Sequence, residues 1–527
     1  MTDVVVIGAG PNGLVAANLL ADAGLEVLVL EEQDKPGGAV RSAELTLPGF
    51  QHDVCSAFYP FAAASPAMQR LDLHHHGLRW RHSPLVLAHP TPDGPTVVLS
   101  RDPEETAASL ERFGAGDGET WRRLTRFWGR AEAPFMRAFT TPFPPVRGAA
   151  DLAVALRLRG LLQFARLGLV PLRRFADENF RGSGGALLIG ANALHADLTP
   201  EMPGSAMFGL ILCGIGQRHG YPMPEGGAQR LTDALVSRLV SRARGGRVET
   251  GERVERVLVQ GGRAAGVRTS TGREILARAG VLADTGAPQL YRELLASQDR
   301  PPRTLRRLGG FQYDNSTIKL DWALSGPIPW SSPEARRAGT IHLADSLDFL
   351  SDATGALERR MIPERPFLIF GQYSQADPSR SPEGTETAWA YSHVPQQTRG
   401  DIRGVLTGRW DAAELEAYAE RMEDEVERHA PGFRKLILGR SVMGPHELEA
   451  HDRNLVGGAL NGGTAQFHQQ LVFRPVLGWG RPETPIPGLY LASASAHPGG
   501  GVHGAPGANA AQALLHSRWR RRRWGAG

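Results

Sequence analysis

Cysteine and lysine are scarce in this sequence of 527 residues. The two cysteines, Cys55 and Cys213, cannot build a disulfide framework, and such low usage is typical of a protein that folds in a reducing cytoplasm. Lysine occurs only at Lys35, Lys319 and Lys435, so arginine carries almost all of the positive charge. We attribute this bias to genome composition and not to function.

A charge imbalance and long apolar runs are lacking as well. The 59 lysine and arginine residues nearly balance the 55 aspartate and glutamate residues, so the composition predicts no nucleic-acid partner. No apolar run reaches the roughly 18 residues that a membrane span requires, and we expect no signal peptide before the first strand. The sequence therefore predicts a cytoplasmic protein of about two to four domains that contacts a membrane, if at all, only at its surface.

The N-terminus carries the strongest motif of the chain. Residues 4–7 are β-branched and predict a buried strand, and Gly8, Gly10 and Gly13 follow it in G-x-G-x-x-G spacing. The first glycine permits a tight turn, the second lets the backbone approach a pyrophosphate, and the third lets the following helix pack on the strand. That helix, expected over residues 12–23, offers free N–H groups and a partial positive charge to a phosphate.

An acidic residue ends the next predicted strand, which covers residues 26–31. Glu31 stands where an acid accepts hydrogen bonds from an adenosine ribose, and its charge argues against an NADP phosphate at that position. Glu32 is the alternative, because strand ends are uncertain by a residue. Strand, glycine turn, helix, strand and acid therefore predict a dinucleotide site.

The residues after Glu31 distinguish FAD from NAD. Gly37 and Gly38 are followed by Arg41 and Ser42, which gives a second close approach of backbone and a cation for a pyrophosphate. This segment resembles the extended FAD fingerprint of the flavin amine oxidase and phytoene desaturase superfamily. By that resemblance Gly37, Gly38 and Arg41 are FAD contacts.

The chain returns to this domain after residue 220. Gly226 and Gly227 lie in a Pro-x-Gly-Gly motif that in this superfamily lies close to the flavin. Short alternating strands joined by glycine turns follow over residues 247–284 and predict a β-meander. The resemblance implies a backbone contact from Val254 to the adenine.

The C-terminal segment carries a second glycine-rich loop. A strand at 488–495 precedes Gly499, Gly501 and Gly504, and a helix is expected to Leu515. No acid follows at the ribose distance, so we interpret the loop as a second contact to the same flavin. The segment resembles the His-Pro-Gly-Gly-Gly signature of phytoene desaturase-like oxidoreductases, including the ketolase branch. The resemblance adds these cofactor contacts: Pro11, Asn12, Gly501, Val502, Gly504.

We therefore expect an α/β protein with a Rossmann-like FAD-binding domain and an inserted α+β substrate domain of mixed sheet and helices. The predicted FAD-binding domain is discontinuous and comprises residues 1–75, 220–300 and 480–527. The predicted substrate domain comprises residues 76–219 and 301–479.

Two segments have alternative interpretations. Residues 151–171 form an apolar helix whose only charges are arginines, and it is either a lid over a cavity or a helix that docks on a membrane. The basic tail at 517–527 is either a solvated end or a segment attracted to anionic lipid. The histidine run at 74–76 favours a surface turn over a metal site, because consecutive side chains point in different directions; we expect no metal.

The predicted function is an FAD-dependent oxidation of a hydrophobic, polyene-like or isoprenoid-like molecule by hydride transfer to flavin N5. His497 and His503 are candidate acid or base groups, and packing in the glycine loop is their alternative role. A flavin amine oxidase is the second hypothesis and would give Lys319 a place near N5, whereas a salt-bridged strand lysine is the simpler interpretation. A non-enzymatic binding protein similar to GDP-dissociation inhibitors is the third, and the intact FAD fingerprint argues against it. The oligomeric state does not follow from the sequence.

Overall fold

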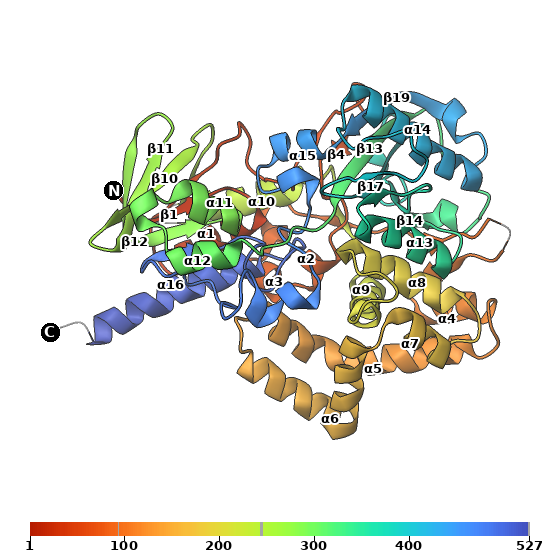
Figure 1. Ribbon diagram of the computed structural model, residues 1–527, viewed down its shortest axis with the longest axis horizontal. Coiled ribbons are helices and arrows are strands. Elements are labelled where there is room, and N and C mark those ends of the chain that lie inside the picture. Colours follow the sequence, from red (N-terminus) through yellow and green to blue (C-terminus); the bar gives the residue numbers. More distant parts are fainter. Residues whose placement is uncertain (93, 243–245, 525–527) are drawn as a thin grey trace.

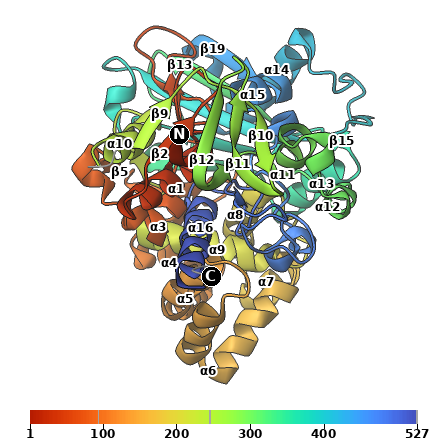
Figure 2. The same ribbon diagram turned by 90° about the vertical axis from the view of Figure 1, so that its left-hand side faces the viewer.

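The structure is a computed structural model that describes residues 1–92, 94–242 and 246–524, without the side chains of 520–524. One half contains both ends of the chain and a sheet around β1 (Figure 1). The other half contains a second sheet with a layer of helices below it, and Figure 2 shows the same halves from the side of the chain ends.

The first sheet has a parallel centre, in the order β10-β11-β12-β1-β2-β9, and β20 pairs with β12. The five strands β20, β12, β1, β2 and β9 pair with one another in parallel. In addition, β12 pairs antiparallel with β11, and β10, β11 and β12 form a meander. The bounds are β1 Thr2–Ile7, β2 Val27–Leu30, β9 Gly246–Glu249, β10 Val254–Gln260, β11 Arg263–Thr269, β12 Glu274–Ala283 and β20 Leu489–Leu491. The residues of β9 are therefore not part of the predicted meander, because this strand pairs in parallel with β2.

Alternating residues of β1 face two different cores. Val4 and Val6 pack with helices α1, α10 and α16, while Val5 and Ile7 pack with the meander and the segment after it. These helices are α1 Pro11–Asp22, α10 Gln229–Val240 and α16 Ala505–Trp524. A sheet covered on both faces explains why its strands are continuously apolar.

The second sheet is mostly antiparallel, in the order β19-β13-β17-β16-β14-β6-β7. One face packs on helix α14 in a core that includes Leu320, Phe370 and Met422. The bounds are β6 Leu85–His89, β7 Val97–Leu99, β13 Ser316–Leu324, β14 Ala338–Leu343, β16 Leu368–Gln372, β17 Glu386–Val394, β19 Ile437–Met443 and α14 Ala412–His429. This arrangement confirms the predicted fold class, a Rossmann-like domain with a mixed-sheet substrate domain.

A helical layer lies below the second sheet in Figure 1. Its members are α4 Pro103–Glu111, α5 Asp117–Thr140, α6 Val146–Leu169, α7 Leu172–Asn179, α8 Gly184–Ala193, α9 Ser205–His219 and α13 Leu347–Glu358. Short elements complete the fold: α2 Pro60–Ala64, α3 Pro66–Gln69, α11 Ala287–Gln289, α12 Pro302–Leu308, α15 Pro445–His451, β3 Ser42–Ala43, β4 His52–Asp53, β5 Trp80–Arg81, β8 Met223–Pro224, β15 Met361–Ile362 and β18 Gly400–Asp401.

Two helices differ from their predicted extent. Helix α6 starts at Val146 and is interrupted at Arg157, whose φ of 54° and ψ of 177° are not helical. Helix α16 continues past Leu515 to Trp524, since arginine is a good helix former and no glycine or proline intervenes. The tail is thus helical up to that point, and its residues 525–527 lie outside the described chain. Among the described residues, no helix combines the length and apolar character needed to cross a bilayer.

Candidate active site

The two ends of the chain meet at the loop between β1 and α1. A Cβ at Gly507, in α16, would lie 1.9 Å from the carbonyl oxygen of Asn12, so only glycine allows this contact of backbones. A Cβ at Gly504 would likewise lie 2.6 Å from Val15 in α1. The C-terminal glycine loop is therefore held against the N-terminal glycine turn.

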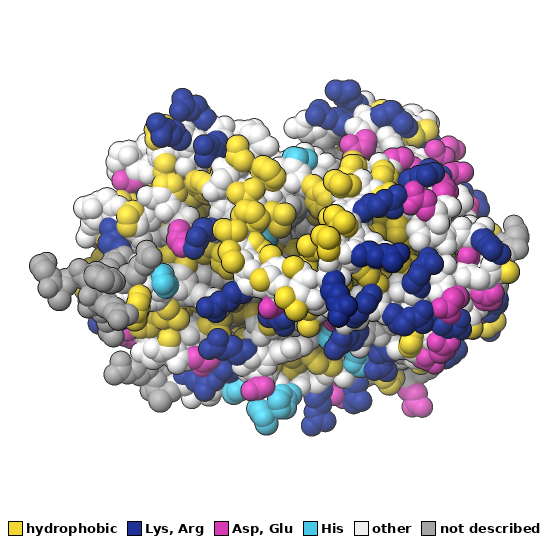
Figure 3. Space-filling model, turned by 90° about the horizontal axis from the view of Figure 1, so that it is seen from below, with side chains coloured by type: hydrophobic (Ala, Val, Ile, Leu, Met, Phe, Trp, Pro, Cys, Tyr) yellow, Lys and Arg dark blue, Asp and Glu magenta, His cyan; other side chains and the backbone are white. Residues whose placement is uncertain are grey.

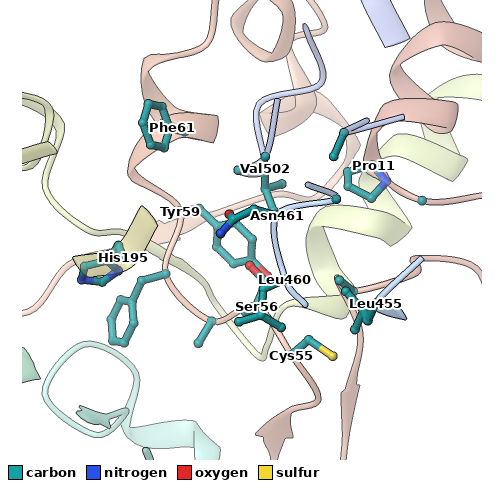
Figure 4. Close-up of a pocket in the computed structure, with 18 of the residues that line it drawn as sticks. Pro11, Cys55, Ser56, Tyr59, Phe61, His195, Leu455, Leu460, Asn461 and Val502 are labelled. Carbon is teal, nitrogen blue, oxygen red and sulfur yellow. The ribbon is translucent and has the colours of Figure 1, made fainter. Parts of the chain in front are cut away.

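Two cavities that share a wall lie beside this junction. The smaller has a volume of about 100 Å³ and is lined by Gly8, Glu31 and Val254 among others. The larger, about 300 Å³, extends from the N-terminus of α1 to the second sheet (Figure 4). Both are lined by these four residues: Gly10, Asp284, Asp452, Asn454. The two cavities therefore lie on either side of the glycine turn, where an extended dinucleotide would need space.

Most predicted cofactor residues line this space. The smaller cavity is lined by Gly8, Gly10, Glu31, Glu32, Gly38 and Val254. The larger is lined by Gly10, Pro11, Asn12, Gly501 and Val502, and Figure 4 shows Pro11 and Val502 next to each other. Four predicted residues line neither cavity: Gly13, Gly37, Arg41, Gly504. Arg41 instead donates from Nε to the carbonyl oxygen of Gly38 at 2.9 Å and so fixes the second glycine turn.

Glu31 is better placed than Glu32 for the ribose. It is buried, and its two carboxylate oxygens accept hydrogen bonds from the N–H groups of Ala9 at 2.8 Å and Gln33 at 3.0 Å. Burial raises the pKa of Glu31, and these two donors oppose the shift. Glu32 instead lies 3.8 Å from Arg253 and 3.7 Å from Arg453, which engages it in surface ion pairs.

Asp284 lies where the two cavities join and was not among the residues predicted from the sequence. Its Oδ2 accepts a hydrogen bond from the N–H of Gly13 at 2.8 Å, one of the free donors in the first turn of α1. Burial raises its pKa to about 8, while the Gly13 donor opposes the shift and Asp452 and Glu31 add to it. One signal could have identified it: Asp284 directly follows β12, at the carboxyl edge beside β1.

The two candidate histidines lie within the glycine-loop region but line neither cavity. The Nδ1 of His503 accepts a hydrogen bond from the N–H of Ala505 at 3.1 Å, so Nε2 carries the proton and donates to the carbonyl oxygen of Gly500 at 3.2 Å. The Nε2 of His497 lies 3.0 Å from the carbonyl oxygen of Thr141. Burial lowers the pKa of both histidines to about 4. With both ring nitrogens engaged, His503 fits the role of organising the loop.

Lys319 is buried on β13 and forms an ion pair with Asp321. Asp321 also lies 3.3 Å from Nδ1 of His52. Lys319 does not line either cavity of the described chain. This geometry agrees with a salt-bridged strand lysine.

The far part of the larger cavity belongs to the second sheet and the helical layer. Apolar side chains such as Phe208, Leu212 and Ile369 line it, together with a few polar groups that include His195. In Figure 4, His195 lies on the opposite side of the cavity from Pro11. An apolar chamber that opens from a dinucleotide loop suits an apolar substrate.

One acidic cluster lies elsewhere and has a structural explanation. Asp345, Glu425 and His429 are close enough to hold a cation. Arg365, however, donates to Asp345 and to Glu425, at 2.7 Å each. The guanidinium pairs with both carboxylates, which gives the cluster a structural role in the core around α14.

Comparisons with known proteins agree with this geometry. The protein family described as NAD(P)-binding Rossmann-like domain matches residues 6–71 of the chain. The chain is 28% identical to pyridine nucleotide-disulfide oxidoreductase domain-containing protein 2 of Rattus norvegicus, over 97% of this chain and 93% of the relative. It is 25% identical to the lycopene-forming phytoene desaturase of Pseudescherichia vulneris, over 98% of this chain and 99% of the relative. The chain is a distant, full-length homologue of the phytoene desaturases.

The chain also shares its fold with a solved amine oxidase. Cyclohexylamine oxidase from Brevibacterium oxydans IH-35A superposes with a TM-score of 0.61 at 15% identity, covering 98% of this chain and 100% of that one. The Rossmann match and the full-length relatives together support an FAD-dependent oxidoreductase of the superfamily that contains phytoene desaturases and amine oxidases.

Proposed function

We propose that this chain binds one FAD along the two joined cavities and oxidises a hydrophobic, isoprenoid-like molecule in the larger one. The observation that carries the proposal is the wall that the two cavities share at Gly10 and Asp284, which places a dinucleotide loop beside an apolar chamber. The distant homology to phytoene desaturases supports a substrate of the isoprenoid class.

The residues present fit FAD. Glu31 lies in the smaller cavity as an acceptor for ribose hydroxyls, and the N-terminus of α1 faces the shared wall as a site for the diphosphate. The larger cavity, flanked by Gly501 and Val502, has room for a ring system. The buried Oδ1 of Asn12 has no hydrogen-bond partner among the described residues, so a ligand group can supply one.

When bound there, FAD supplies a hydride acceptor at N5 of its ring. The chain holds the cofactor by backbone at the glycine turns. Phe208, Leu212 and Ile369 exclude water from the substrate half, and this apolar wall orients a substrate C–H towards the cofactor half.

An amine is the alternative substrate in this fold. Trp389 and Tyr391 favour it, since their stacked rings, with centroids 6.0 Å apart, line the larger cavity as an aromatic wall. The engagement of Lys319 with Asp321 weighs against it. Anaerobic mixing of FAD-loaded protein with polyenes, oxygenated isoprenoids and primary amines tests the two. We expect the visible flavin absorbance to bleach with isoprenoids, and bleaching only with amines would contradict the proposal.

The helical layer offers a surface for contact with a membrane. Val154, Leu158 and Leu162 of α6 have side chains that are 81%, 74% and 63% exposed. The C-terminal end of α6 reaches a second exposed group around Phe467, which lies next to Gly168. Figure 3 shows hydrophobic side chains gathered on this side of the molecule, with lysine and arginine side chains beside them. We refer to these α6 residues, with Phe467, as the α6 surface.

We propose that the α6 surface docks on an anionic lipid surface, from which an apolar substrate enters. Exposed arginines at 147, 157 and 159 give it the matching charge. Co-sedimentation with vesicles of phosphatidylglycerol should capture the protein better than vesicles of phosphatidylcholine alone. The change Leu158→Asp with Leu162→Asp should abolish capture, and equal capture of the variant and the wild type would overturn this proposal.

A further inference from the structure

The face of the second sheet that looks into the larger cavity carries polar groups among its apolar and aromatic residues. Strands in a sheet alternate their side chains between faces, and the face towards α14 is apolar, with Ile341, Phe370 and Ala390. On the opposite face, neighbouring strands place Thr340 beside Gly371 and Gly371 beside Trp389. Thr340 and Trp389 both line the cavity.

Of the described residues of this face that line the cavity, two have a buried polar atom without a hydrogen-bond partner. These atoms are Oγ1 of Thr340 and Nε1 of Trp389. Trp389 lies over Gly371, because a Cβ at Gly371 would stand 2.4 Å from Nε1. The indole ring therefore lies over the middle strand, β16, which is also the neighbour of the strand of Thr340. Buried polar atoms are almost always paired, so two unpaired ones on a cavity wall point to a ligand that pairs them.

A third polar group completes this part of the wall. His195, which follows α8, places Nε2 2.9 Å from Nε2 of His342, two residues after Thr340 on the same face of β14. One of the two nitrogens must donate and the other accept, so the pair fixes the His195 ring. His195 lines the cavity, and burial lowers its pKa to about 3, which keeps the ring neutral at neutral pH.

The charge of the cavity selects among oxygen groups. Among the described residues that line it, none is lysine or arginine, and its acids, Asp284 and Asp452, lie at the wall shared with the smaller cavity. A carboxylate or phosphate would find no counter-ion here. An indole N–H requires an acceptor, and the threonine hydroxyl and the neutral histidine can each donate or accept.

We propose that Thr340, Trp389 and His195 form a binding site for a neutral oxygen group, a hydroxyl or a carbonyl, on an otherwise apolar substrate. This inference deepens the proposed function and depends on it for the role of the cavity. It assigns the substrate to oxygenated isoprenoids and not to plain hydrocarbons.

The test compares three isoprenoids of equal carbon number: geraniol with a hydroxyl, geranial with a carbonyl, and the hydrocarbon myrcene. Binding to the FAD-loaded protein is measured by quenching of tryptophan fluorescence. We expect geraniol and geranial to bind more tightly than myrcene, by about fivefold for each hydrogen bond that they make. Equal affinities for the three compounds would overturn the proposal.

Near-isosteric variants locate the effect. Thr340→Val should lower the affinity for geraniol about fivefold and leave the affinity for myrcene unchanged. Trp389→Phe should lower the affinity for geranial by a similar factor, because this change removes the N–H donor. Thr317→Val is the matched control, since its hydroxyl is also buried without a partner on this sheet but lines neither cavity. An equal loss of preference in the Thr340 and Thr317 variants would contradict the assignment.

The visible spectrum of the same samples separates this proposal from the proposed function. A protein that takes up no FAD but still binds geraniol more tightly than myrcene would refute the proposed FAD binding and support the oxygen site. A flavoprotein that binds all three compounds equally would keep the flavin and refute the oxygen site.

Discussion

The two sheets meet the same cavity with different kinds of groups. At the first sheet the contacts come from backbone, at glycine turns such as Gly10, and Glu31 already has hydrogen-bond donors in place. At the second sheet the contacts come from side chains, and Thr340 and Trp389 have polar atoms that find no partner in the part of the chain that the structure describes. On the proposed function, the first half would hold one fixed ligand by its phosphates, whereas the second would leave its polar atoms to a ligand that side chains select.

The strictest geometry lies in the first half, and breaking it should have the largest effect. A Cβ at Gly13 would stand 2.3 Å from the carbonyl oxygen of Gly8, and neither backbone can retreat. Gly13→Ala should therefore abolish FAD uptake and lower the free energy of unfolding by about 3 kcal/mol. Flavin absorbance after gel filtration and chemical denaturation measure the two effects.

Gly129 provides the control for this change. It is exposed in α5, and no atom lies within 4 Å of the point where a Cβ would stand, so Gly129→Ala should keep the flavin and gain about 1 kcal/mol. Normal FAD content in the Gly13 variant would show that the turn does not contact the cofactor.

Asp284 gives the next largest effect, through pH. Because its pKa in the folded chain is raised to about 8, the carboxyl is mainly protonated below that pH and ionised above it. The ionised form repels a diphosphate, so FAD affinity should fall as pH rises above about 8, by up to tenfold per pH unit. Titrations of FAD binding at a series of pH values measure this.

Asp284→Asn should bind FAD with a flat pH profile. In the cofactor-free protein, the raised pKa also means that stability declines as pH rises from the unfolded value of 3.8 towards about 8, and this variant should lose that decline. Asp233→Asn, exposed on α10, is the control. A wild-type affinity that is constant across this range would remove Asp284 from the cofactor site.

His503 tests whether the first half uses side chains for structure only. His503→Phe removes the hydrogen bonds to Ala505 and Gly500 and should lower the free energy of unfolding by about 2 kcal/mol. The pH profile of flavin reduction should keep its shape. A stable variant whose profile loses an ionisation would instead make His503 an acid or base, and His446→Phe at an exposed position controls for the loss of an imidazole.

The smallest effect concerns the outer surface of the second half. Arg157→Gln and Arg159→Gln should each weaken binding to anionic vesicles by about 1 kcal/mol, as the free energy of partitioning measures. The same change at the exposed Arg123 on α5, Arg123→Gln, serves as the control. Vesicle binding that does not respond to these arginines would leave α6 as a lid.

The glycine turn after β1 was predictable from the sequence because its residues follow one another along the chain. Gly8, Gly10 and Gly13 lie within one turn and its helix, so their spacing alone encodes the backbone approach. The C-terminal loop around Gly501 was assigned instead through its resemblance to the signature of phytoene desaturase-like oxidoreductases, and its contact with a flavin stays a prediction. Asp284 was missed because it reaches Gly13 only through the parallel pairing of β12 with β1.

The substrate half was not predictable for a similar reason. Thr340 and Trp389 become neighbours through the register of three strands, and His195 reaches the same wall from a helix of the other layer. No spacing in the sequence marks this group. In β14, Thr340 and His342 alternate with Ile341 and Leu343, which predicts a polar face for that strand but not that the face looks into a cavity.

The central claim is that one FAD lies between the two ends of the chain, and a visible spectrum tests it most directly. Protein incubated with excess FAD and then gel filtered should show the flavin bands at one FAD per chain, and acid precipitation should release the flavin intact. A colourless protein after this treatment, with its fold preserved by circular dichroism, would contradict the account.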